Sequence, residues 1–341
     1  MLRLPSFEVI APETLEDAVA ALARPGARVI AGGTDLLPNL KHRLDAPPRL
    51  VSVQRIADLR GIVRGPDAVV IGAAVTLAEL SADPDVAALF PSLAQAAGVV
   101  ASPPIRNMAT IGGNIHLDTR CRYVNQSAFW RSAIHGCLKA DGEVCHVVPG
   151  GQRCVAAMSA DCVPALITLD AEIVLVGPRG TRTVRLVDYY RNDGTAHIKK
   201  DADEIMSEVR LPIPTGPSRA TYVKWTVRQS IDFPLLSVAL RFDLASLPGD
   251  SVDAPGDVRR AKIAAAKVCV GVLNARPRVL PTDRLIGREL GDDAVIDELC
   301  ASIYQRCRPL ENVPYEAPYR RKMLPVYTRR AMTQLVSVEV G

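Results

Sequence analysis

Residues 29–36 read VIAGGTDL, and residues 106–114 read RNMATIGGN. Both stretches place two glycines beside small polar residues. Because glycine lacks a Cβ, its backbone N–H groups approach a ligand closely, and consecutive N–H groups form a concave site for an anion. Two such loops facing each other are expected to hold a pyrophosphate. The alternative interpretation is that both are ordinary tight turns.

The sequence lacks the better-known nucleotide-binding signatures. No G-x-G triplet occurs, so there is no Rossmann fingerprint, and no G-K-[ST] triplet occurs, so there is no P-loop. Any nucleotide site in this chain would therefore differ from these two types, and ordinary tight turns remain the alternative.

The composition is that of a globular protein. The 341 residues are 48% hydrophobic, 23% charged and 4% aromatic, and the length suggests more than one domain. Lys and Arg (41) only slightly exceed Asp and Glu (37), which argues against a nucleic-acid-binding protein. No apolar run approaches the roughly 18 residues of a membrane span, and the N-terminus does not resemble a signal peptide. We therefore expect a cytoplasmic protein with neither nucleic-acid nor membrane partners.

Hydrophobic patterns predict helices and strands without regular alternation, which favours an α+β fold over a doubly wound sheet. Thr14 is placed to cap a helix that reaches Leu22, and a Pro/Gly cluster at 212–217 predicts a linker. The other predicted elements are strands at 28–31 and 68–71, helices near 77–80 and 93–100 (the latter stopped by Pro103-Pro104), a hairpin over 173–186, strands at 222–227, 238–242 and 262–272, and a helix near 294–304.

Five of the eight cysteines fall within residues 121–162, in a polar stretch without helical or strand periodicity. Such a long irregular segment needs a constraint to hold it together, and four thiolates around one metal centre would supply it. Soft sulfur ligands select zinc, copper(I) or an iron–sulfur cluster. The paired cysteine knuckles of zinc sites are absent, but spacing alone leaves an iron–sulfur cluster, zinc and buried structural thiols open. Cys269, Cys300 and Cys307 lie among apolar residues and are expected in the core.

Several further motifs occur in a fixed order: Asp161-Cys162-Val163-Pro164-Ala165-Leu166, then Asp170-Ala171, Glu204-Ile205, Pro212, Lys224, Arg228, Asp232 and the tail Tyr319-Arg320-Arg321-Lys322. Together with the two diglycine stretches, they resemble the FAD-binding (medium) subunit of the molybdenum hydroxylases, the xanthine dehydrogenase and carbon monoxide dehydrogenase group. The resemblance covers nearly the whole chain. It implies an FAD-binding PCMH-type (vanillyl-alcohol-oxidase-like) domain with two α/β subdomains over residues 1–215, and a C-terminal CO-dehydrogenase-flavoprotein-like α+β domain over 216–341.

The cysteine-rich stretch, about residues 117–159, departs from most of the family. Within it, Asp118-Thr119-Arg120-Cys121, Asn125-Gln126-Ser127, Trp130-Arg131-Ser132, Cys137-Leu138-Lys139 and Cys145-His146-Val147 are similar to the β subunit of 4-hydroxybenzoyl-CoA reductase, which carries an insertion that binds an extra 4Fe–4S cluster. The resemblance implies that Cys121, Cys137, Cys145 and Cys154 ligate such a cluster here, and that Cys162 does not. Arg120, Arg122, Arg131 and Arg153 are candidates to stabilise its reduced state, or else solvated surface.

The resemblance also implies which residues contact FAD. Val29, Ile30, Ala31, Gly32, Gly33, Thr34, Asp35 and Leu36 would wrap the pyrophosphate, and Thr110, Ile111, Gly112, Gly113 and Asn114 would form the facing loop. Ala101 would approach the flavin, Asp161 would accept a hydrogen bond from a flavin or ribitol group, and Lys224 would lie near the isoalloxazine. Tyr123 is a further flavin candidate, with loop packing as the alternative. The sequence offers no grouping for substrate chemistry, so no catalytic residue is predicted.

By the same resemblance, the chain would be an electron-transferring subunit. A ferredoxin-like donor would reduce the 4Fe–4S cluster and then FAD, and electrons would pass through a small 2Fe–2S subunit to a molybdopterin-binding large subunit, which removes the hydroxyl group of an aromatic acyl-CoA. A dimer of heterotrimers is expected. Two alternatives stay open: an oxidative hydroxylase that acts on an aromatic or heterocyclic substrate, and a zinc-stabilised scaffold without catalytic function.

Overall fold

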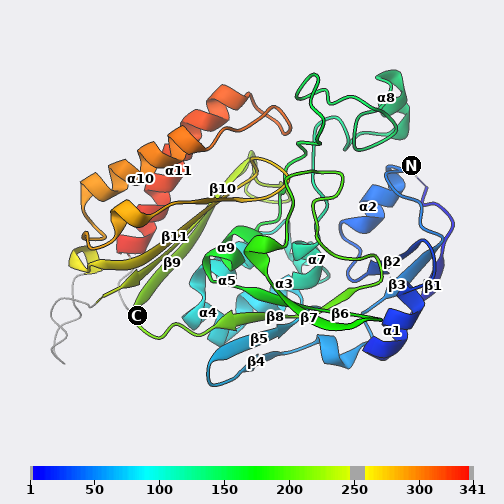
Figure 1. Ribbon diagram of the computed structural model, residues 1–341, viewed down its shortest axis with the longest axis horizontal. Helices are drawn as coiled ribbons and strands as arrows, with labels where there is room; N and C mark the ends of the chain where they lie inside the picture. Colours follow the sequence, from blue (N-terminus) through cyan, green and yellow to red (C-terminus); the bar gives the residue numbers. More distant parts are fainter. Residues whose placement is uncertain (1–2, 246–257, 338–341) are drawn as a thin grey trace.

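The computed structural model describes residues 3–245 and 258–337 (Figure 1). Three sheets organise this part of the chain. The first is a parallel sheet of order β1-β3-β2, made by β1 (Glu8–Ile10), β2 (Ala27–Ile30) and β3 (Arg49–Ser52). Helix α1 (Leu15–Leu22) packs on it, and Thr14 Oγ1 accepts a hydrogen bond from the Asp17 amide (3.1 Å), which confirms the predicted cap. The first diglycine stretch follows β2 and leads into α2 (Leu36–Lys41).

The second sheet is antiparallel, with order β4-β5-β8-β6-β7. Its strands are β4 (Ile62–Arg64), β5 (Ala68–Gly72), β6 (Glu172–Gly177), β7 (Gly180–Arg185) and β8 (Ile205–Pro212). The predicted hairpin over 173–186 is confirmed as β6–β7, with Gly177 opposite Gly180.

A layer of helices lies between this sheet and the third (Figure 1). The third sheet is antiparallel, and the inward faces of both sheets contribute to one apolar core, which contains Val209 from β8 and Tyr222 from β9. The helices of the layer are α3 (Leu77–Ala82), α4 (Pro84–Leu89), α5 (Pro91–Gly98), α6 (Pro103–Arg106), α7 (Ile111–Ile115) and α9 (Cys162–Thr168). The third sheet has the strand order β12-β11-β10-β9. Its strands are β9 (Ser218–Trp225), β10 (Leu236–Leu244), β11 (Ile263–Gly271) and β12 (Arg278–Leu280).

Two long helices, α10 (Asp293–Arg306) and α11 (Ala317–Ser337), cover the other face of the third sheet (Figure 1). Short 3₁₀ turns occur at Ala57–Leu59, Leu186–Asp188, Val258–Arg260 and Asp283–Leu285. The stretch 117–159 is irregular except for α8 (Ala128–Ala133), and it stands over α2 at the edge of the molecule. The α+β expectation is confirmed.

Three local predictions need correction. Helix α5 ends at Gly98, and Pro103 and Pro104 begin α6 rather than stop a helix, because proline suits the first helical turn, where its missing N–H costs nothing. The second diglycine stretch is helical. The third correction is α11, a helix that the hydrophobic pattern did not predict and that contains Pro325, a residue that usually ends a helix.

The Pro/Gly cluster at 212–217 joins β8 to β9, as the linker prediction requires. Within the described residues, no helix combines the length and apolar character needed to cross a bilayer.

Candidate functional site

The two diglycine segments, loop 1 (29–36) and loop 2 (110–114), are joined through the residues before loop 2. A Cβ added to Gly32 would lie 1.8 Å from the Met108 carbonyl oxygen, so only glycine permits this approach of the two backbones. Gly33 has a φ of +70°, a left-handed conformation that glycine adopts without strain. The pairing predicted from the sequence is therefore a direct backbone contact.

The two loops differ in their free amides. Among the hydrogen bonds of the described residues, the N–H groups of residues 32–35 in loop 1 have no acceptor in the protein. In loop 2, the Gly112 amide donates to the Ala73 carbonyl (2.9 Å) and the Gly113 amide to Thr110 Oγ1 (3.0 Å). Loop 1 thus presents a row of unpaired amides of the kind that binds anions, and loop 2 supports it as the first turn of α7.

A buried ion pair lies at the start of α9. Asp161 Oδ2 is 3.1 Å from Lys224 Nζ, and Asp161 Oδ1 accepts a hydrogen bond from the Tyr222 hydroxyl (2.6 Å). Burial raises the pKa of the Asp161 carboxyl, while the Lys224 charge opposes that change. A buried, hydrogen-bonded pair of this kind holds its side chains in one geometry.

The ion pair connects to the other predicted flavin residues. Lys224 Nζ donates to the Val99 carbonyl (3.0 Å), two residues before Ala101, whose φ of +42° is unusual for a residue with a Cβ. The Cys162 amide donates to Asn114 Oδ1 of loop 2 (3.2 Å). Contacts therefore run continuously from loop 1 through loop 2 to Asp161, Lys224 and Val99-Val100-Ala101.

Asp35 points its carboxylate toward the cysteine-rich insertion. It forms an ion pair with Arg120 and accepts a hydrogen bond from the Asp118 amide (3.2 Å). Burial raises the pKa of Asp35, opposed by the Arg120 guanidinium. Arg120 also lies over the Phe233 ring, 3.9 Å from its centroid, so one side chain joins loop 1, the insertion and the β9–β10 connection.

The four predicted cysteine ligands line a single cavity. Cys121, Cys137, Cys145 and Cys154 line a small cavity, here called the cysteine cavity, whose wall also contains Tyr123, Leu138, Lys139 and His146. Burial raises the pKa of the Cys121 thiol, and raises that of Cys154 to about 11. Cys162, Cys269, Cys300 and Cys307 are buried elsewhere, as expected.

Backbone amides point at the cavity sulfurs. Val148 N–H donates to Cys145 Sγ and Ala156 N–H to Cys154 Sγ, each at 3.4 Å. Such bonds stabilise negative charge on sulfur. Across the described residues, no group of three His, Cys, Asp or Glu side chains is arranged to hold a single metal ion; the thiols instead ring the cavity.

The remaining predicted residues have different surroundings. Tyr123 lines the cysteine cavity and stacks on His146, with 5.1 Å between ring centroids, so its neighbours are those of the insertion. Arg131 is buried and donates to the His42 and Gln126 carbonyls. None of the four arginines predicted to stabilise the reduced cluster lines the cavity. Lys139, which was not among the predicted residues, lines it.

Comparison with known proteins identifies the family. Residues 5–214 match the model described as the FAD binding domain in molybdopterin dehydrogenase, and residues 221–335 match the CO dehydrogenase flavoprotein C-terminal domain. The chain belongs to the FAD-binding subunits of the molybdenum hydroxylase family. The carbon monoxide dehydrogenase medium chain of Hydrogenophaga pseudoflava is 29% identical over 335 residues, 96% of each chain.

Other members of the molybdenum hydroxylase family are also similar to this chain in sequence or in fold. The FAD-binding subunit of an aldehyde oxidoreductase from Escherichia coli (strain K12) is 35% identical over 233 residues, which cover 66% of this chain and 73% of that one. A chain of the reconstituted CO dehydrogenase from Oligotropha carboxidovorans superposes with a TM-score of 0.77 at 25% identity, over 98% of this chain and 99% of that chain. FAD binding and membership in an oxidoreductase family follow, and the unpaired amides of loop 1 fit the flavin nucleotide's pyrophosphate.

A buried histidine shortly after loop 2 is expected to make this family member sensitive to acid. His116 Nδ1–H donates to the Gly112 carbonyl and Nε2 accepts from the Tyr189 hydroxyl, both at 2.8 Å. Burial lowers its pKa from 6.5 to about 4. The unfolded chain takes up a proton near pH 6.5 and the folded chain only near pH 4, so stability is complete above pH 6.5 and falls as the pH drops toward 4, by about 3 kcal/mol.

Urea unfolding at pH 7.5, 6.0 and 5.0 measures this loss, and His116→Gln is expected to flatten the pH dependence. His197, whose pKa burial also lowers to about 4, contributes a second share that His116→Gln leaves in place. The matched substitution of exposed His135, His135→Gln, should keep the parent slope. An equal slope in His116→Gln and the parent would contradict the prediction.

Proposed function

We propose that this chain is the FAD and iron–sulfur subunit of a molybdenum hydroxylase complex related to 4-hydroxybenzoyl-CoA reductase. In this proposal Cys121, Cys137, Cys145 and Cys154 ligate a 4Fe–4S cluster, and the chain passes electrons between an external donor and its partner subunits. The observation that carries the proposal is the convergence of these four thiols, and no other cysteine, on one cavity.

The cavity's chemistry supports a cluster. Its ligand set is all sulfur, its wall is largely apolar, and amides donate to two of the sulfurs, all features of protein iron–sulfur sites. A zinc ion binds thiolates at about 2.3 Å and would bring their sulfurs within roughly 4 Å of one another. The four-iron centre suits thiols that ring a cavity from widely spaced sequence positions.

The flavin site is proposed to keep the residue roles implied by the family. Free amides of loop 1 bind the pyrophosphate, loop 2 holds loop 1 in place, and the Asp161–Lys224 pair orients polar groups near Ala101. Bound FAD supplies the capacity to exchange electrons singly or in pairs. The proposed domain division is 1–215 and 216–341, with the insertion at about 117–159.

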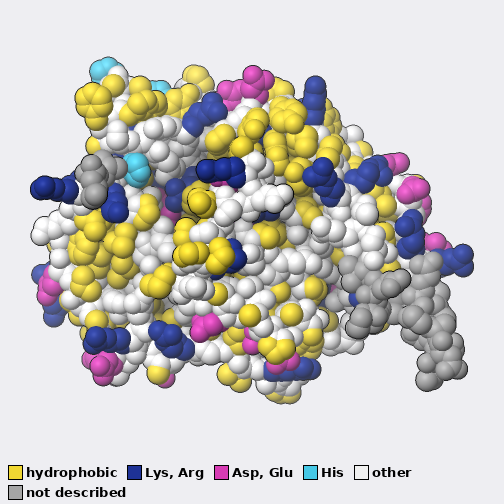
Figure 2. Space-filling model, turned by 180° about the vertical axis from the view of Figure 1, so that it is seen from behind, with side chains coloured by type: hydrophobic (Ala, Val, Ile, Leu, Met, Phe, Trp, Pro, Cys, Tyr) yellow, Lys and Arg dark blue, Asp and Glu magenta, His cyan; other side chains and the backbone are white. Residues whose placement is uncertain are grey.

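The proposed partners are a molybdopterin-binding large subunit, a small 2Fe–2S subunit and a ferredoxin-like donor, in a dimer of heterotrimers. The names of relatives as medium chains or subunits support a multi-subunit assembly. The insertion exposes apolar side chains, among them Phe129 (85% exposed) and Val144 (54%). Figure 2 shows apolar and histidine side chains together at the upper left, over the insertion. Exposed apolar surface of this kind is typical of protein–protein contacts, which supports docking of the donor here.

Two directions of electron flow have support. The insertion favours reductive removal of the phenolic hydroxyl from an aromatic acyl-CoA. The relatives' names, a carbon monoxide dehydrogenase and an aldehyde oxidoreductase, favour the oxidative direction; an aromatic or heterocyclic substrate is the proposed alternative for that direction.

The experiment that tests the cofactor proposal is anaerobic purification of the full chain, followed by flavin, iron, sulfide and zinc analysis and an absorption spectrum. We expect flavin bands, a broad brown shoulder bleached by dithionite, and no stoichiometric zinc. A colourless zinc protein would support the scaffold alternative. Assay of the co-purified complex with 4-hydroxybenzoyl-CoA and a strong reductant, against an aldehyde or heterocycle with an electron acceptor, decides the direction.

A further inference from the structure

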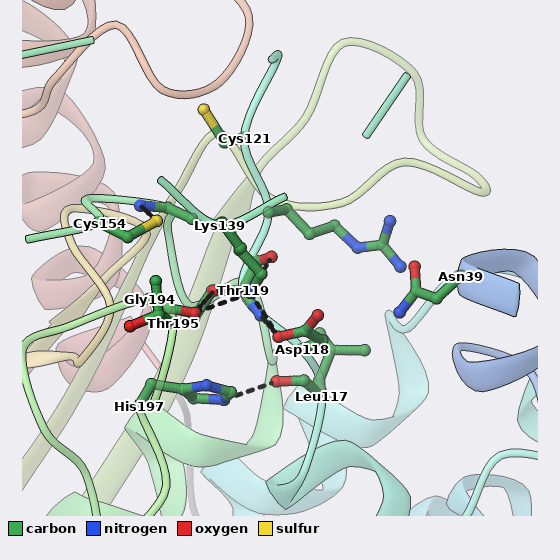
Figure 3. A network of polar contacts seen from close by, with 12 residues as sticks. Asn39, Leu117, Asp118, Thr119, Cys121, Lys139, Cys154, Gly194, Thr195 and His197 are labelled. Carbon is green, nitrogen blue, oxygen red and sulfur yellow. Dashed lines mark hydrogen bonds and ion pairs between the residues drawn. The ribbon is translucent and has the colours of Figure 1, made fainter. Parts of the chain in front are cut away.

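Lys139 places a buried positive charge beside the cysteine cavity. Its side chain is 10% exposed, its stem lines the cavity, and its ammonium donates to the Gly194 carbonyl (2.8 Å) and the Thr119 carbonyl (3.2 Å). Figure 3 shows Lys139 beside Cys154, with its end directed toward Asp118, Thr119 and Gly194. Several hydrogen bonds therefore fix the ammonium of a residue that lines the cavity.

The charge of Lys139 has one anionic partner among these contacts. Asp118 Oδ1 lies 2.5 Å from Lys139 Nζ, but the Asp118 side chain is 38% exposed, so water screens it more than it screens the lysine. Lys139 is among the residues that line the cavity, whereas Asp118 is not. The pair thus presents its positive end to the cavity.

We propose that the Lys139–Asp118 pair sets the reduction potential of the cluster, with Lys139 raising it and Asp118 lowering it. This inference rests on the proposed cluster. Reduction adds one electron, taken from a low-potential one-electron donor protein, to a centre that its four thiolates already make negative. A fixed cation nearby stabilises the added charge, and charge near the sulfurs is one of the factors that sets such potentials.

The same pair reaches the flavin side of the molecule. The Asp118 amide donates to Asp35 of loop 1 (3.2 Å), and Arg120, two residues later, pairs with the same carboxylate. The segment that carries the counter-charge for Lys139 is therefore attached to the loop proposed to bind the pyrophosphate. In this proposal Lys139 acts on the cluster through its fixed positive charge and takes no part in substrate chemistry.

The test is an anaerobic redox titration of the full chain, followed by electron paramagnetic resonance of the reduced cluster. Lys139→Gln keeps an N–H donor but removes the charge, and we expect the equilibrium constant for one-electron reduction to fall about tenfold, a potential lower by about 59 mV. Lys139→Arg keeps the charge and should stay near the parent. Arg153→Gln removes an equal charge next to Cys154 from an exposed side chain, and solvent screening should make its shift smaller.

Asp118→Asn provides the opposite sign. It leaves the Lys139 charge uncompensated, so the reduction potential should rise. A general disturbance of the insertion would not shift the potentials of Lys139→Gln and Asp118→Asn in opposite directions. If Lys139→Gln loses its iron, the Asp118→Asn result decides. A Lys139→Gln potential no lower than that of Arg153→Gln at full iron content, or an unchanged or lower potential in Asp118→Asn, overturns the inference. A parent chain without iron instead overturns the proposed function.

Discussion

Cys137→Ser is expected to reduce the iron and acid-labile sulfide of the purified chain to background while FAD still binds. Cys137 is one of the four thiols that line the cysteine cavity, and a hydroxyl is a poor substitute for a soft thiolate ligand. The residues proposed to contact FAD, in loop 1 and the Asp161–Lys224 pair, do not include Cys137, so the yellow flavin absorption should survive. Reduction of the bound flavin by a ferredoxin-like donor, the proposed electron donor, should slow sharply.

The matched control is Cys307→Ser, in the core of the C-terminal half. Cys307 is fully buried and lies outside the cavity, so this variant tests loss of a buried thiol without loss of a ligand. It should keep full iron at some cost in stability, about 1–3 kcal/mol if the new hydroxyl finds no partner. Unchanged iron in Cys137→Ser, or equal loss in both variants, would refute the ligand assignment.

The grouping of four cysteines around one cavity could be anticipated because cysteines are rare and their clustering is visible in the sequence. Cys162 shows the limit of spacing alone: it lies only eight residues after Cys154, yet it enters α9 and is buried away from the cavity. The resemblance, not the spacing, excluded it. The hairpin β6–β7 and the Thr14 cap were also predictable, since both depend on residues close in sequence.

The electrostatics of the site were not predictable in the same way. The four arginines of the insertion are ordinary candidates by composition, but Arg131 is turned toward the carbonyls after α2, and Arg120 is engaged by Asp35. Lys139 becomes significant only because Gly194 and Asp118, distant in sequence, converge on its ammonium. Likewise, the hydrogen bond from the Gly112 amide to the Ala73 carbonyl is a tertiary contact that no local pattern encodes, whereas the bond from the Gly113 amide to Thr110 Oγ1 is a local helix N-cap.

Gly32→Ala is expected to weaken FAD binding by about 100-fold. The added Cβ would lie 1.8 Å from the Met108 carbonyl oxygen, where ordinary contact requires at least 3.4 Å, so the backbone of loop 1 or of the segment before loop 2 has to move. Residues 32–35 are proposed to offer their amides to the pyrophosphate as a set, so a displacement would misdirect several of them. Loss of two hydrogen bonds to a charged group costs about 3 kcal/mol, which corresponds to roughly that factor.

The measurement is FAD affinity by fluorescence quenching on chain from which flavin has been removed, with circular dichroism to show that the variant is folded. Gly216→Ala is the matched control, because a Cβ there meets nothing within 4 Å and the residue lies in the β8–β9 connection. It should bind FAD like the parent. If a folded Gly32→Ala chain bound FAD with the affinity of the parent, the pyrophosphate would have to bind elsewhere. That result would overturn the assignment of loop 1.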